Sequence, residues 1–115
     1  MQTMTHATRA YGAAAVRRSQ REQEADVFHR TIGVLRAARD ASPSDRVRAL
    51  ADNRRLWTMV GDLMRDPLST LPAPLRAQII SVGLALHREM DLDEPDFAYL
   101  ITINEHIAIG LSSQG

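Results

Sequence analysis

Apolar residues recur at the i, i+3, i+4, i+7 spacing of an amphipathic helix in four parts of the chain, over residues 25–38, 56–64, 75–90 and 97–111. Nowhere do apolar and polar residues alternate over the length of a strand, and there is no internal repeat. The pattern therefore predicts an all-α fold, a small bundle of three to four core helices packed antiparallel where neighbours allow. Residues 1–18 have weaker apolar spacing and predict a loosely packed N-terminal helical arm.

The helix boundaries are marked by proline and by capping residues. The first firm helix ends near Asp40, and Ser42 then suits the N-cap of a second helix, with Pro43 at its first position. This second helix runs to about Arg65, where Asp66-Pro67 stops it.

Proline and acidic residues also mark where the third and fourth helices begin. Leu71-Pro72 sets an extended entry, because a residue before proline is pushed away from the α conformation. The third helix begins near Pro74 and ends between Met90 and Leu92. The acids that follow suit the N-terminus of a fourth helix, with Pro95 in its first turn.

Composition limits the kind of protein this can be. At 115 residues the chain suits one domain, 1–115, with a single modest core. Aromatic residues make up only 4%, so the interior must be built from Leu, Ile, Val, Met and Ala. We find neither a stretch of about eighteen apolar residues nor a signal-peptide pattern, which predicts a cytoplasmic protein without membrane insertion.

Charge divides unevenly along the chain although the formal net charge is zero. All 14 basic residues are Arg, and residues 1–60 carry a net charge of about +5 against −5 for residues 61–115. We expect most of this difference to cancel within the fold; the alternative is a molecule with two poles that steer partners.

Catalytic and metal-binding patterns are missing from the sequence. The chain has no cysteine, and its four histidines form no metal-ligand spacing. There is no Gly-rich phosphate loop and no nucleophile elbow. We therefore expect a binding protein with no cofactor and no enzymatic activity.

Three residues stand out from their surroundings. Trp57 is interpreted as a core anchor, with a partly exposed interface contact as the alternative. Asn104 falls in the apolar stripe of the last helix and must find hydrogen-bond partners, which predicts a polar lock on carbonyl groups freed by Pro72 or Pro74, or else a contact with a partner chain. Tyr11 has little to pack against in its own segment and is the preferred partner contact of the arm.

The sequence also resembles a known family. Asn53, the pair Leu56-Trp57, Asp62-Leu63, Leu71-Pro72, Leu75-Arg76-Ala77, Ser81 and Gly83 match the pattern of the flagellar FlaF proteins in order and spacing. Ala10-Tyr11-Gly12, Ile103-Asn104, Ile107 and Gly110-Leu111 are similar to the start and end of that family. The resemblance implies an α-proteobacterial protein that helps flagellin to be made and exported, as a flagellin-binding chaperone with a regulatory role.

This reading gives a set of candidate partner-binding residues. They are Tyr11, Trp57, Met59, Met64, Leu71, Pro72, Arg76 and Met90. The Met side chains are candidates because flexible thioethers adapt to a partner helix, although they can equally fill gaps in a core. Flagellin is the expected partner.

Two alternatives stay open. One is a regulator of flagellin mRNA translation that acts with an FlbT-like partner, and the other is an oligomerisation module that forms homo-oligomers. Direct RNA binding is disfavoured, because Tyr11 is the only aromatic residue near the basic cluster Arg17-Arg18 and Arg21.

Overall fold

The computed structural model describes residues 23–113, and these form four helices and no strand. The described part of the first helix spans residues 23–38, and it is followed by α2 (Pro43–Met64), α3 (Ala73–Met90) and α4 (Phe97–Ser113). The all-α prediction is confirmed. The predicted arm over residues 1–18, including Tyr11, lies outside the described residues.

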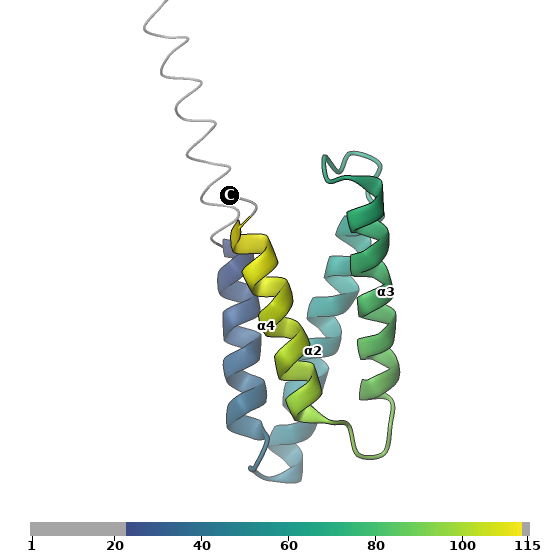
Figure 1. Ribbon diagram of the computed structural model, residues 1–115. Coiled ribbons are helices and arrows are strands. Elements are labelled where there is room, and N and C mark those ends of the chain that lie inside the picture. Colours follow the sequence, from purple (N-terminus) through teal and green to yellow (C-terminus); the bar gives the residue numbers. More distant parts are fainter. Residues whose placement is uncertain (1–22, 114–115) are drawn as a thin grey trace, which may run out of the picture.

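Successive helices run in opposite directions, so the chain folds up and down (Figure 1). The α2 and α3 helices form one hairpin, and α4 returns to lie beside the 23–38 helix. An ion pair between Arg36 and Glu105 joins the 23–38 helix to α4. Toward the end of the molecule where residue 23 lies, the α2–α3 hairpin diverges from the other pair, and the arrangement opens.

Local capping explains where α2 begins. Ser42 is extended, and its Oγ accepts a hydrogen bond from the backbone N–H of Asp45 at 3.2 Å, with Pro43 following at the start of the helix. This satisfies one of the donors that a helix N-terminus leaves free. The predicted start at Ser42-Pro43 and end near Arg65 are confirmed.

The start of α4 differs from the prediction for Pro95. Asp96 accepts a hydrogen bond from the N–H of Tyr99 through its Oδ1 at 3.1 Å, and its carbonyl oxygen accepts from the N–H of Leu100. Asp96 is therefore the N-cap, and α4 begins at Phe97. Pro95 lies before the helix and not in its first turn, because the carboxylate of Asp96 takes the capping role.

The core is mainly aliphatic, as the composition predicts, but it also contains the aromatic rings of Phe28, Trp57 and Phe97. Leu35, Leu86 and Leu100 are fully buried on three different helices, and Phe28 meets Trp57 edge to face with ring centroids 5.9 Å apart. At the opposite end of the molecule from residue 23, the guanidinium of Arg46 lies 4.8 Å from the centroid of the buried Phe97 ring. This cation–π contact ties the start of α2 to the start of α4.

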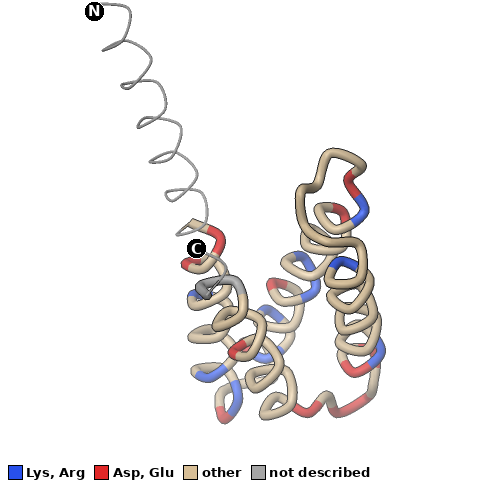
Figure 2. Tube along the Cα trace, turned by 45° about the horizontal axis from the view of Figure 1, so that its top comes forward, with Lys and Arg blue, Asp and Glu red and all other residues tan. Residues whose placement is uncertain are grey.

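Charges from the two halves of the sequence pair with each other. Arg36 pairs with Glu105, and Arg54 Nη2 contacts Asp91 Oδ1 at 3.1 Å while also donating to the carbonyl oxygen of Met90 at the end of α3. The acids of the α3–α4 connection stand out in Figure 2. These two pairs support the expectation that the charge difference between the halves partly cancels within the fold.

The α2 and α3 helices approach closely at Gly83. A Cβ atom at this position would lie 3.2 Å from Cε3 of Trp57, which is tighter than most carbon contacts allow. Because the indole is buried and its Nε1 is hydrogen-bonded to Asn104, a shift away from a Cβ atom would disturb its packing and this hydrogen bond. The absence of a side chain at Gly83 therefore sets the spacing of the hairpin.

Two glycine substitutions test this spacing. Gly83→Ala should lower the free energy of unfolding by about 1–2 kcal/mol, because overpacking against Trp57 outweighs the gain of about 1 kcal/mol in helix propensity. Gly33→Ala is the matched control, since nothing lies within 4 Å of its Cβ position, and it should raise stability by about 0.5–1 kcal/mol. Urea unfolding followed by circular dichroism measures both. Equal stabilisation by both substitutions would contradict the close approach.

Candidate functional site

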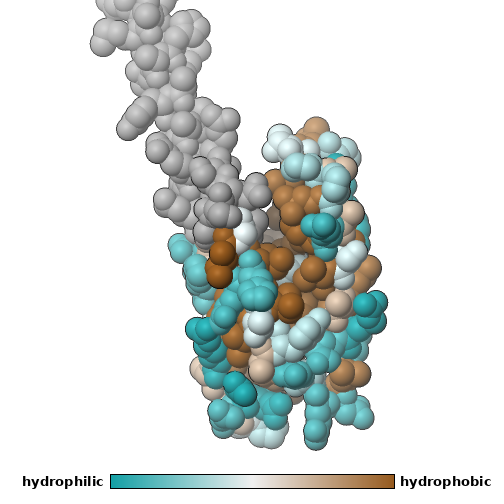
Figure 3. Space-filling view, in the orientation of Figure 1, coloured by the Kyte–Doolittle hydropathy of each residue, from teal (hydrophilic) through white to brown (hydrophobic). Residues whose placement is uncertain are grey.

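An apolar groove opens between the α2–α3 hairpin and the pair formed by the 23–38 helix and α4. Its volume is about 380 Å³, within the range of ligand-binding clefts. It is lined by Gln23, Glu24, Val27 and Phe28, by Leu56, Met59, Val60, Leu63 and Met64 of α2, by Ile79 of α3 and by Ile107 of α4. Figure 3 shows it as a brown hollow between the two halves of the molecule.

One wall of the groove is the apolar face of α2. Leu56, Met59, Val60 and Leu63 follow i, i+3, i+4, i+7 spacing, which places them on one face of the helix. Leu56 and Val60 are buried, whereas Met59 and Leu63 keep 47% and 46% of their surfaces exposed. The predicted stripe therefore divides into a part that fills the core and a part that lines an open surface.

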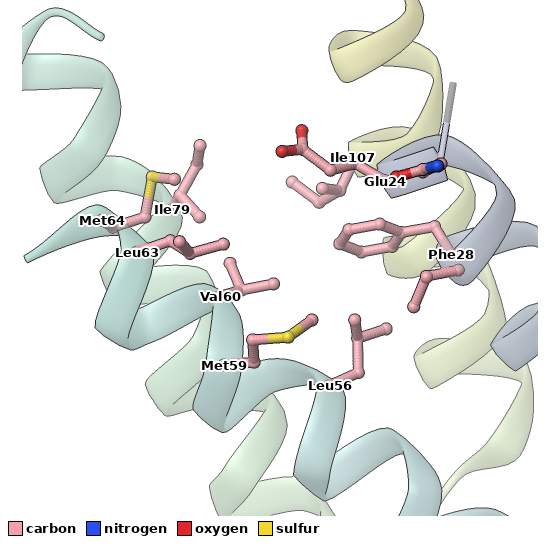
Figure 4. A pocket seen from close by; sticks show the side chains of 11 residues that line it. Glu24, Phe28, Leu56, Met59, Val60, Leu63, Met64, Ile79 and Ile107 are labelled. Carbon is pink, nitrogen blue, oxygen red and sulfur yellow. The ribbon is translucent and has the colours of Figure 1, made fainter. Parts of the chain in front are cut away.

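The opposite wall comes from two other helices. Figure 4 shows Phe28 of the 23–38 helix and Ile107 of α4 facing Val60, Met59 and Leu63 across the groove. Glu24 lies at the rim on the same side as Phe28. Residues widely separated in the sequence thus create one concave surface, and its polar side chains, Gln23 and Glu24, lie together on the 23–38 helix.

A buried chain of hydrogen bonds connects α2, α3 and α4, three of the four helices that line the groove. Trp57 Nε1 donates to Asn104 Oδ1 at 2.7 Å, Asn104 Nδ2 donates to Asn53 Oδ1 at 2.7 Å, and Asn53 Nδ2 donates to Met90 Sδ at 3.2 Å. The indole N–H can only donate and the thioether sulfur can only accept, so the two ends fix the orientation of both amides. No buried side-chain nitrogen or oxygen among the described residues lacks a partner.

In the structure Asn104 makes internal hydrogen bonds, and their partners differ from the predicted ones. Asn104 binds Trp57 and Asn53 and not carbonyl groups near Pro72 or Pro74, because α4 crosses the middle of α2 and not the α2–α3 loop. Trp57 itself is only 2% exposed. It is therefore a core anchor with almost no surface for a partner, and its interpretation as a partly exposed contact is wrong.

The three candidate methionines do not share one surface. Met59 and Met64 line the groove, but Met90 is buried at the far end of α3, where its sulfur accepts from Asn53. The antiparallel course of α2 and α3 explains this, since it places the ends of the two helices at opposite ends of the hairpin. The single Met-containing surface expected from the sequence is thus reduced to Met59 and Met64.

Leu71, Pro72 and Arg76 lie at the α2–α3 turn and do not line the groove. Leu71 is half-buried and packs on the core, while Pro72 is exposed. The guanidinium of Arg76 donates to the carbonyl oxygens of Leu71 at 3.1 Å and Met64 at 3.5 Å. Arg76 therefore fixes the turn, because it satisfies the loop carbonyl of Leu71 and the Met64 carbonyl that the end of α2 leaves free.

Sequence reasoning did not select Leu63, Ile79 or Ile107 as candidate site residues. Each belongs to a predicted apolar stripe, and such a stripe looks the same in a sequence whether another helix covers it or not. Only the divergence of the helices shows which members stay accessible. One feature of the sequence pointed to the groove. Leu56, Val60 and Met64 are enough to form a core-facing stripe on α2, so a further apolar residue at Leu63 indicates additional apolar surface.

Within the described part of the chain, the groove is lined mainly by apolar side chains, with Gln23 and Glu24 as polar ones. Among the described residues, no group of three or more His, Asp or Glu side chains is placed to hold a metal ion. In the same part of the chain, no helix combines the length and the apolar character needed to cross a membrane. The arrangement suits binding of another apolar surface, such as one face of an amphipathic helix.

Comparison with known protein families identifies a match over most of the sequence. The family described as "Flagellar protein FlaF" matches residues 7–111, which is nearly the whole chain. No curated protein and no solved structure matches this sequence.

Removal of Asn104 tests the buried hydrogen-bond chain. Asn104→Leu should lower the free energy of unfolding by about 2–5 kcal/mol, because it leaves the indole N–H of Trp57 and the Oδ1 of Asn53 buried without a partner. Urea unfolding followed by circular dichroism measures the loss. Thr58→Ala is the control, since it removes an exposed hydrogen bond to the carbonyl of Arg54 and should cost less than about 0.5 kcal/mol.

A double substitution separates the hydrogen bond from general packing. When Trp57 is already Phe, Asn104→Leu leaves one fewer orphaned donor and should cost at least about 1 kcal/mol less than in the natural chain. Strictly additive losses would show that the two side chains do not interact.

Proposed function

This chain belongs to the FlaF family of flagellar proteins, and on that premise we propose that it binds flagellin in the groove as a cytoplasmic export chaperone. In this role the protein shields an aggregation-prone helix of flagellin before export and couples flagellin synthesis to secretion. No chemical step is involved, and the interaction is one of binding alone.

The observation that carries this proposal is the half-exposed apolar wall of the groove. Met59 and Leu63 project from the same face of α2 toward Phe28 and Ile107 without closing the space between them. Burial of the remaining surface of Met59 and Leu63 would stabilise a complex by about 1 kcal/mol each. A helix with apolar residues at i, i+3, i+4 and i+7 presents the matching shape.

Methionine at the groove suits a partner of this kind. Met59 and Met64 have unbranched, polarisable side chains that adopt several rotamers at little cost, so the wall can adjust to the side chains of a partner helix. Flagellin is proposed as the partner because the chain belongs to a family of flagellar proteins. The groove provides the apolar surface that a flagellin helix would contact.

The charges around the groove favour a complex that tolerates salt. Among the residues that the structure describes, Glu24 is the only charged one that lines it. Several arginines of the described chain are already engaged, Arg36 and Arg54 with acids and Arg76 with backbone carbonyls. A contact driven by apolar burial depends weakly on salt, whereas binding to nucleic-acid phosphates weakens steeply as salt rises.

Matched substitutions on α2 and α3 test the groove. Leu63→Ser should weaken flagellin binding about 5- to 30-fold, because it removes apolar contact worth about 1–2 kcal/mol. Leu84→Ser is the control, since Leu84 is 49% exposed, similar to the 46% of Leu63, but lies outside the groove. Calorimetry with the cognate flagellin at low and high salt measures both, and circular dichroism checks that helix content is unchanged.

The same titration locates the flagellin segment and separates the alternatives. Loss of binding on truncation of one flagellin terminus would assign the bound helix to that terminus. Equal affinity of the Leu63→Ser and Leu84→Ser proteins would rule out the groove. If flagellin does not bind at all, titration with flagellin mRNA and an FlbT-like partner tests the regulatory alternative.

A further inference from the structure

We propose that residues 7–16 of this same chain dock in the groove when no partner is bound, so that the protein carries its own displaceable occupant. Docking of this segment is inferred from the groove and from the sequence alone, and it does not depend on flagellin being the partner. The identity of the molecule that displaces the segment rests on the proposed function.

The groove lies where the described chain begins. Gln23 and Glu24, the first two described residues, line it themselves. Residues 17–22 read Arg-Arg-Ser-Gln-Arg-Glu, a polar stretch of the length that commonly connects antiparallel helices. A reversal within this stretch brings residues 7–16 back along the groove, and ten helical residues extend about 15 Å.

The segment has one apolar face of a suitable size. Ala7, Ala10, Tyr11 and Ala14 follow i, i+3, i+4, i+7 spacing, and Tyr11 is the only large side chain among them. An open space of about 380 Å³ admits one aromatic ring with small residues on either side. An amphipathic tyrosine can bury its ring and keep its hydroxyl at the wet rim.

Charge also favours docking within the chain. Residues 1–22 contain four Arg and one acid, a formal charge of +3, whereas residues 23–115 contain ten Arg and thirteen acids, a formal charge of −3. Glu24 contributes one of these acids at the rim of the groove. The two parts therefore attract each other, and the short linker keeps their effective concentration high.

The same composition makes the occupant easy to displace. Alanines bury little surface, and Gly12 lowers the helix propensity of the segment. A partner helix with larger apolar residues at the same spacing competes successfully. If the segment fills the groove in ten molecules of eleven, the apparent affinity for the partner falls about tenfold.

This inference gives Tyr11 a role opposite to that of a direct partner contact. As an internal occupant, Tyr11 competes with the partner, so Tyr11→Ala should strengthen partner binding several-fold. As a direct contact, the same substitution would weaken it.

Cysteine pairs in the full-length chain test the docking without flagellin. The natural sequence has no cysteine, so two introduced thiols can react only with each other within one molecule. Ala10→Cys, which keeps the natural Tyr11 ring beside it, is combined with Met59→Cys on one wall, with Ile107→Cys on the other wall, or with Val47→Cys as the control. Val47 lies on the same helix as Met59, about 18 Å away, and at 67% exposed it is the more accessible of the two.

In oxidised glutathione, both groove pairs should form intramolecular disulfides at least tenfold faster than the Val47 control. Equal rates for the groove pairs and the control would overturn the proposal. Disulfide-linked dimers whose formation rises with protein concentration would also overturn it, by assigning the groove to a second copy. If one groove variant fails to fold by circular dichroism, the pair on the opposite wall decides.

Added flagellin then separates this proposal from the proposed function. A slower rate of groove disulfide formation in its presence supports competition for one site. An unchanged fast rate keeps the docked segment and counts against flagellin as its competitor.

Discussion

The buried hydrogen bonds from Trp57 through Asn104 and Asn53 to Met90 constrain the rest of the structure. They join α2, α3 and α4 by polar groups that cannot be left unpaired in an apolar interior. An aliphatic core of Leu, Ile and Ala tolerates small shifts of one helix along another. A directed chain between a donor-only indole and an acceptor-only sulfur does not, because a shift of one turn would orphan every member.

This anchoring explains how the groove can remain open. Asn53 and Trp57 lie toward the middle of α2, while Met59, Leu63 and Met64 continue toward its end, beyond the fixed point. Gly83 brings α3 against the Trp57 ring, so the α2–α3 hairpin is rigid where it is fixed. The hairpin can then diverge from the 23–38 helix and α4 at its far end without loss of register.

The parts of the fold that depend on neighbouring residues were predictable from the sequence, and those that depend on distant ones were not. Ser42 and Pro43 predict the start of α2 correctly, because an N-cap side chain bonds to a backbone N–H only three residues further along the chain. The need of Asn104 for partners was also visible, but Trp57 and Asn53 are 47 and 51 residues away and only the packing of α4 on α2 identifies them. The groove was hidden for the same reason, since the periodicity of Met59 and Leu63 is that of a covered stripe.

An open apolar wall has a cost in the isolated protein, and its position limits that cost. Exposed Met59 and Leu63 forgo burial of about 1 kcal/mol each, a noticeable part of the stability of a small domain. That loss falls on the diverging end of the bundle, while the hydrogen-bond chain, the Phe28–Trp57 contact and the Arg46–Phe97 contact hold the other parts together. Separation of the anchored region from the open region lets one short chain keep a defined fold and still present a surface that gains stability only when something covers it.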